Sequence, residues 1–107
     1  MVGPRKFDVI FQCLMAAATL AITPAFGADA DNGERLARRW CSSCHVVASN
    51  QRRATGEAPP FSTIAKKPNF DAPKVAFFLL NPHPKMPNMG LSRSEAGDLA
   101  AYIATQK

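Results

Sequence analysis

The sequence has few of the features that a large or multifunctional protein needs. It has only 107 residues, of which 20% are charged, with a single Trp, a single Tyr and two His. This length allows one small domain and excludes a multidomain enzyme. Because 47% of the residues are hydrophobic, the composition also excludes a disordered tail.

The sequence also lacks a hydrophobic run long enough to cross a membrane. Its longest apolar stretch, residues 9–22, has 14 residues, whereas a membrane-spanning helix needs about 20. Two basic residues precede this stretch, and Pro24 with a run of small residues follows it. This arrangement is typical of a secretory signal peptide rather than an uncleaved anchor. We therefore expect residues 1–27 to be removed by cleavage after Gly27.

Cleavage would leave residues 28–107 as an exported, periplasmic domain. A second cut is available at residues 28–30, and lipid attachment at Cys13 is disfavoured because Gln12 stands where a small residue is needed. The exported domain carries 11 basic and 7 acidic side chains, a net charge of +4. We expect it to meet no nucleic acid and not to be an integral membrane protein.

Cysteine is scarce in this domain, which keeps only Cys41 and Cys44. A domain of about 80 residues buries only about 60–65% of its unfolded surface and needs additional stabilisation. A disulfide between two cysteines so close in sequence closes a very small loop and supplies little of it. A large covalently held cofactor would supply more.

Residues 41–45, Cys-Ser-Ser-Cys-His, have the Cys-x-x-Cys-His pattern of c-type haem attachment. At a helix end such spacing puts three side chains on one side, so Cys41 and Cys44 reach two porphyrin vinyl groups while His45 reaches the iron. A thioredoxin-like thiol pair would need a βαβ context, which the sequence lacks. A zinc site would need four ligands, with His83 the one further strong candidate. The pattern thus predicts one haem c attached through both cysteines.

From about Asp31 to Ile103 the chain resembles class I cytochrome c of the small bacterial periplasmic type. The resemblance implies an all-α fold in which three to four helices wrap one covalently attached haem. The order is an N-terminal helix entering the cysteine motif, a Pro-rich loop, a middle helix, a Met-bearing loop and a C-terminal helix packed across the first.

The first helix is expected to begin at Asp31, with Glu34 completing a cap like a capping box. It runs over residues 33–40, where Leu36 and Trp40 share a face that we expect to meet the last helix. In the last helix, Ser92 and Glu95 form a capping box, and an apolar face follows, made of Ala96, Leu99, Tyr102 and Ile103.

The resemblance implies that Gly33 lets Tyr102 come close to the first helix. Gly97 has no such role and is expected to face outward.

Seven of the nine prolines fall in residues 59–87 and mark a loop region. Within it, Asp71 is expected to cap a middle helix with Pro73 in its first turn, ending at Asn81. Because residues 75–80 of this helix are apolar almost all round, we expect it to be sandwiched between the porphyrin and a loop.

The resemblance also suggests the groups around the iron. A proline carbonyl is expected to accept a hydrogen bond from the His45 ring, with Pro59 preferred and Pro60 as the alternative. Met86, which is followed by a proline, is expected to be the sixth ligand, and Met89 and His83 are the alternatives.

With both axial positions filled, the iron has no open position for a substrate, so we expect an electron carrier and not an enzyme. The alternative is a haem subunit of a larger periplasmic dehydrogenase or oxidase, so the chain acts as a monomer or within a redox complex. Basic side chains on loops near the haem are expected to dock on an acidic surface of a redox partner. They are Arg52, Arg53, Lys66, Lys67 and Lys85.

Overall fold

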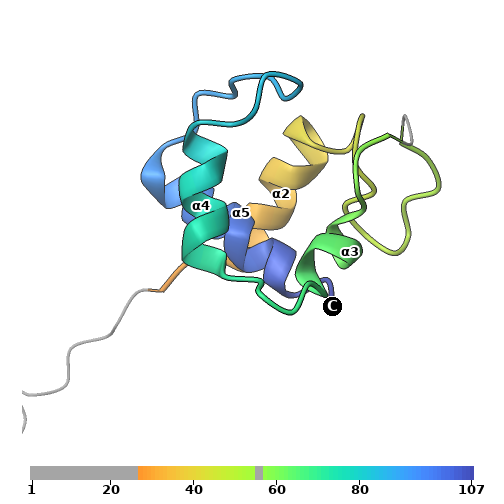
Figure 1. Ribbon diagram of the computed structural model, residues 1–107, viewed down its shortest axis with the longest axis horizontal. Helices are drawn as coiled ribbons and strands as arrows, with labels where there is room; N and C mark the ends of the chain where they lie inside the picture. Colours follow the sequence, from red (N-terminus) through yellow and green to blue (C-terminus); the bar gives the residue numbers. More distant parts are fainter. Residues whose placement is uncertain (1–26, 55–56) are drawn as a thin grey trace, which may run out of the picture.

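The computed structural model describes residues 27–54 and 57–107. These residues form four α-helices and no strand: α2 (Ala30–Trp40), α3 (Phe61–Ala65), α4 (Ala72–Leu80) and α5 (Arg93–Ala104) (Figure 1). The expected all-α fold of three to four helices is confirmed. Almost all of the predicted signal peptide, Cys13 included, lies outside the described residues.

The C-terminal helix α5 is the centre of the arrangement. It packs against α2, α3 and α4, whereas within the described ranges these three helices make no helix–helix contact with one another. Figure 1 shows α4 and α2 on either side of α5. The three helices therefore depend on α5 for their placement, and the loops between them are free to line a site.

A glycine makes the close crossing of α2 and α5 feasible. A Cβ built on Gly33 would lie 2.7 Å from the Cβ of Tyr102 and 2.6 Å from the carbonyl carbon of Asp98. Such distances are sterically forbidden, so only a residue without a side chain fits there. The close approach of Tyr102 at Gly33, expected from the resemblance, is confirmed, and Gly97 has open space around it as expected.

The start of α2 differs from the expectation. Its N-cap is Asp29, whose carboxylate accepts from the backbone N–H of Asn32 at 3.1 Å, so the expected cap at Asp31 with Glu34 is wrong by two residues. The reason is a contact distant in sequence. The buried carboxylate of Asp98 accepts from the backbone N–H of Asp29 at 2.7 Å and from the amide of Asn32 at 2.9 Å.

The face of α2 that meets α5 also differs. The buried residues of α2 are Gly33 and Ala37, whereas Leu36 is only partly buried and Trp40 is 39% exposed. The expected face of Leu36 and Trp40 is therefore only partly right: Leu36 packs against the hydrophobic core, whereas Trp40 does not belong to it. A close crossing selects the face with the smallest side chains, and it leaves the larger ones at the edge of the interface.

The caps of the other two long helices are as expected. The Asp71 carboxylate accepts from the backbone N–H of Lys74 at 3.2 Å, with Pro73 in the first turn of α4. Ser92 and Glu95 form a complete capping box at the start of α5, with hydrogen bonds of 3.0 and 2.9 Å. Each cap satisfies backbone N–H groups that have no partner inside the helix.

Two features of the middle region were not expected. A short helix, α3, follows Pro60 within the predicted loop and buries Phe61 and Ala65. In α4, Leu79 is buried, but Phe77 is 77% exposed, so the expectation that the whole helix is sandwiched is wrong for Phe77.

Candidate functional site

Two adjoining hollows, of about 310 and 480 Å³, lie beside the cysteine motif. Five residues line both hollows. They come from the cysteine motif, the Pro-rich loop and the Met-bearing loop: Cys41, His45, Pro59, His83 and Met86. The structure thus brings together residues that are far apart in sequence and that the sequence singled out separately.

The cysteine motif begins where α2 ends. Cys41 is the C-cap residue of α2, and its carbonyl accepts from the backbone N–H groups of Cys44 at 3.2 Å and His45 at 2.8 Å. The chain therefore makes one more turn, and both thiols and the imidazole line the first hollow. Neither sulfur is in a disulfide; Cys41 is buried and Cys44 is exposed.

A hydrogen bond and a ring contact hold the imidazole of His45. Its Nδ1 donates to the carbonyl oxygen of Pro59 at 2.6 Å, and its ring packs against Phe61 with centroids 5.4 Å apart. The carbonyl of Pro60 instead accepts from the backbone N–H groups of Thr63 and Ile64 in α3. With Nδ1 engaged as a donor, the tautomer is set and Nε2 is the nitrogen left to bind a metal.

The Met-bearing loop supplies three candidate ligands. Met86 and His83 line both hollows, whereas Met89 lines only the first. His83 and Met86 are joined by a turn, in which the backbone N–H of Met86 donates to the carbonyl of His83 at 2.9 Å. The Nδ1 atom of His83 accepts from the backbone N–H of Lys85 at 3.1 Å.

The walls of the second hollow are mostly apolar, as a porphyrin ring requires. Within this lining, α3, α4, α5 and the α3–α4 connection contribute large side chains: Phe61, Ile64, Phe70, Val75, Phe78, Leu79, Leu99 and Ile103. The Cys41 thiol, an imidazole with a fixed tautomer and the Met86 thioether therefore face a space walled by hydrophobic groups, and the Cys44 thiol lines the adjoining first hollow. The residues present fit a covalently held haem.

The Cys41 thiol is not suited to redox chemistry of its own. Burial, and to a smaller extent the neighbouring Cys44, raises the pKa of the Cys41 thiol to about 11. A thiol oxidoreductase needs a thiolate near neutral pH, hence a lowered pKa. In residues 27–54 and 57–107, moreover, no group of three or more His, Cys, Asp or Glu side chains is placed to hold a metal ion. The thioredoxin-like and zinc alternatives thus gain no support.

Comparison with known proteins decides the family. The model of the family described as cytochrome c oxidase, cbb3-type, subunit III matches residues 28–103. A curated relative, cytochrome c-552 of Bradyrhizobium diazoefficiens, is 53% identical over 93 residues, which cover 87% of this chain and 89% of the relative. The chain belongs to the cytochrome c family. No solved structure matches it significantly.

As a small bacterial monohaem class I cytochrome c, the protein is an electron-transfer protein and not an enzyme. Membership of the family implies a covalently bound haem c. Cys41 and Cys44 have the spacing that this attachment needs.

The distribution of positive charge around this cytochrome site agrees only partly with expectation. Lys85 lines the first hollow and Lys67 the second, whereas Lys66 and the two arginines at 52 and 53 line neither. Sequence reasoning missed Lys74, which lines the second hollow from α4. Its only signal was a charge in the first turn of an apolar helix.

A polar residue was also missed. Gln51 makes four hydrogen bonds to the backbone around the cysteine motif, although nothing in the sequence pattern distinguishes it from its polar neighbours.

In the described ranges, none of the helices has the length and hydrophobicity needed to span a bilayer.

Proposed function

We propose that this cytochrome is a periplasmic carrier of single electrons, with its haem bound through Cys41 and Cys44 and its iron coordinated by His45 and Met86. The observation that carries the proposal is the shared space: all four side chains line the first hollow. When bound, the haem supplies a metal centre that takes up and releases one electron.

The protein's own residues fix the properties of that centre. The hydrogen bond to Pro59 leaves Nε2 of His45 free for the iron and fixes the orientation of the ring. A thioether as second axial ligand raises the reduction potential relative to a second imidazole. If His45 and Met86 both coordinate the iron, no position would be open for a substrate.

Met86 is a better candidate than Met89 or His83 for the second ligand. It lines both hollows and packs against the hydrophobic core, whereas Met89 lines one hollow only. His83 is exposed and already uses Nδ1 to accept from the Lys85 backbone.

Export with cleavage after Gly27 is consistent with the start of α2. Asp29 caps this helix and is bonded to Asp98 through its own N–H. A cut after Ala30 would remove both interactions, whereas a cut after Gly27 keeps them. The family match begins at residue 28, the first residue of the proposed mature chain.

The openings of the two hollows suggest how a partner docks. Lys67, Lys74 and Lys85 are exposed and line them, and with the acidic Glu57 and Asp71 in the same lining the net charge is +1, carried by the second hollow. Opposite charge on a redox partner would steer the encounter and make it sensitive to salt. We propose an acidic partner surface and a monomeric carrier.

A second candidate is a haem subunit of a larger periplasmic dehydrogenase or oxidase. It is favoured by one observation, the match to a family named for an oxidase subunit. Size-exclusion chromatography of natively extracted protein separates the two: a carrier elutes at the monomer mass, and a subunit elutes with its large partner.

The optical spectrum of the oxidised and reduced protein tests the main proposal. We expect a c-type spectrum that survives acid–acetone extraction, because the haem is covalently bound. A high-spin spectrum would contradict two strong axial ligands, and a colourless protein with titratable thiols would contradict the haem itself.

A further inference from the structure

Gln51 makes an unusual set of contacts with the segment that carries His45. It is half-buried and lies six residues after His45. Its Oε1 accepts from the backbone N–H of Val47 at 2.9 Å. Its Nε2 lies within hydrogen-bond distance of three carbonyl oxygens: Ser42 at 2.8 Å, His45 at 2.9 Å and Arg53 at 2.9 Å.

Two of these hydrogen bonds fix backbone carbonyls within the cysteine motif, those of Ser42 and His45. Ser42 stands between the two cysteines, and His45 is the residue whose ring faces the hollow. An NH₂ group has two hydrogens, so the three carbonyls share them. The Gln51 amide thus contacts backbone carbonyls that lie before, at and after His45 in the sequence.

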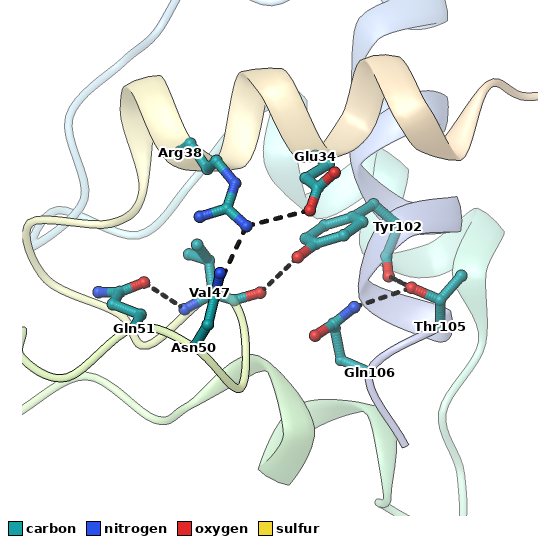
Figure 2. A network of polar contacts seen from close by, with 8 residues as sticks. All are labelled: Glu34, Arg38, Val47, Asn50, Gln51, Tyr102, Thr105 and Gln106. Atoms are coloured by element: carbon teal, nitrogen blue, oxygen red, sulfur yellow. Dashed lines mark hydrogen bonds and ion pairs between the residues drawn. The ribbon is translucent and has the colours of Figure 1, made fainter.

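The backbone beyond His45 is fixed by further bonds. Val47 is fully buried; Gln51 binds its N–H, and the Tyr102 hydroxyl donates to its carbonyl at 2.7 Å (Figure 2). The carbonyl of Val46 accepts from the N–H of Phe61 at 2.9 Å. Since Tyr102 belongs to α5, the segment is tied to the central helix of the fold.

The position of an imidazole depends on its ring and on the backbone that carries it. The Pro59 carbonyl fixes the ring of His45 at Nδ1. We propose that Gln51 is the second restraint: a positioning residue that sets the orientation of the His45 ring at the iron by holding the His45 carbonyl. This inference rests on the proposed haem ligation by His45.

The structure offers a control for mere stabilisation of the loop. Tyr102 and Gln51 both bind the backbone of Val47, one at its carbonyl and the other at its N–H. Only Gln51 binds the carbonyls of Ser42 and His45. Tyr102→Phe removes the first bond and keeps the ring in place, so it weakens the same segment without releasing His45.

The test compares three variants of the haem-loaded protein with the parent. Gln51→Met keeps the length of the side chain and removes its hydrogen bonds, whereas Gln51→Glu keeps the acceptor for Val47 and removes the donors. For each, the hyperfine-shifted ¹H resonances of the His45 ring are recorded in the oxidised state, together with the reduction potential and the denaturation midpoint.

We expect both Gln51 variants to shift the His45 resonances and the potential, and Tyr102→Phe to lower only the denaturation midpoint. If Gln51→Met does not mature, Gln51→Glu alone decides. Gln51 variants with a lower midpoint but with parental His45 resonances and potential would overturn the positioning role. A parent protein whose mass shows no haem would instead overturn the proposed function, and this inference with it.

Discussion

The α2–α5 crossing of this cytochrome and the walls of the two hollows are built on different principles. At the crossing, Ala37 of α2 is fully buried, and Gly33 lets two backbones meet. On the side of the hollows, large aromatic side chains keep much of their surface exposed, with Trp40 at 39% and Phe78 at 43%. The first region is a core of protein atoms alone, and in the proposed haem-loaded protein the second would present its apolar groups to the haem. Substitutions at the crossing should therefore change the free energy of unfolding, whereas substitutions beside the hollows should change the haem content or the properties of the haem.

The largest effect is expected from the attachment cysteines. Cys41→Ala and Cys44→Ala each remove one thioether bond, so covalent haem should fall sharply in each variant and be lost in the double variant. Intact mass and the optical spectrum measure this yield. Ser43→Ala is the control, because Ser43 lines the same hollow without an attachment role and should keep the haem. Normal yield of covalent haem in both single variants would contradict the assignment.

The second effect concerns the axial thioether. Met86→Ala should abolish the weak far-red absorption of a sulfur–iron bond in the oxidised protein and lower the reduction potential. Met89→Ala should keep the band, because Met89 lines only one hollow. An unchanged band in Met86→Ala, with its loss in Met89→Ala, would move the ligand to Met89.

The third effect tests the crossing, with two glycines of the described chain compared. Gly33→Ala places a Cβ against the α5 backbone, and the overpacking should cost about 1–3 kcal/mol in the free energy of unfolding. Gly97→Ala, where a Cβ meets nothing within 4 Å, should instead stabilise α5 by about 1 kcal/mol. Urea unfolding of the haem-loaded protein measures both. Equal free energies for the two variants would refute the close crossing.

The smallest effect concerns charge at the mouth of the site. Lys85→Gln should slow electron exchange with ferrocyanide, an anion, by a few-fold at low salt, and it should slightly speed exchange with a cationic cobalt complex. Lys107→Gln is the control, since Lys107 lines neither hollow. Rates that do not depend on ionic strength, or equal effects of the two substitutions, would speak against electrostatic steering.

The local signals in the sequence predicted much of this structure. The Cys41–His45 motif, the Asp71 cap and the Ser92–Glu95 capping box each depend on residues within five positions of one another, so their spacing carries the information. The meeting of Gly33 with Tyr102 was expected only through the resemblance to class I cytochrome c.

The features that sequence reasoning missed depend on contacts between distant residues. The cap of α2 moves to Asp29 because Asp98, which is 69 residues away, binds it. The helix α3 has five residues, too few to show a helical period. Gln51 is one polar residue in a polar loop, and its role follows only from the fold that brings four backbone groups around it.

Covalent attachment of the haem can be tested by the intact mass of the exported, matured protein. We expect the mass of residues 28–107 plus that of one haem, retained after denaturation because two thioether bonds hold it. A mass equal to that of the polypeptide alone would contradict covalent attachment at Cys41 and Cys44, and with it the role proposed for the site.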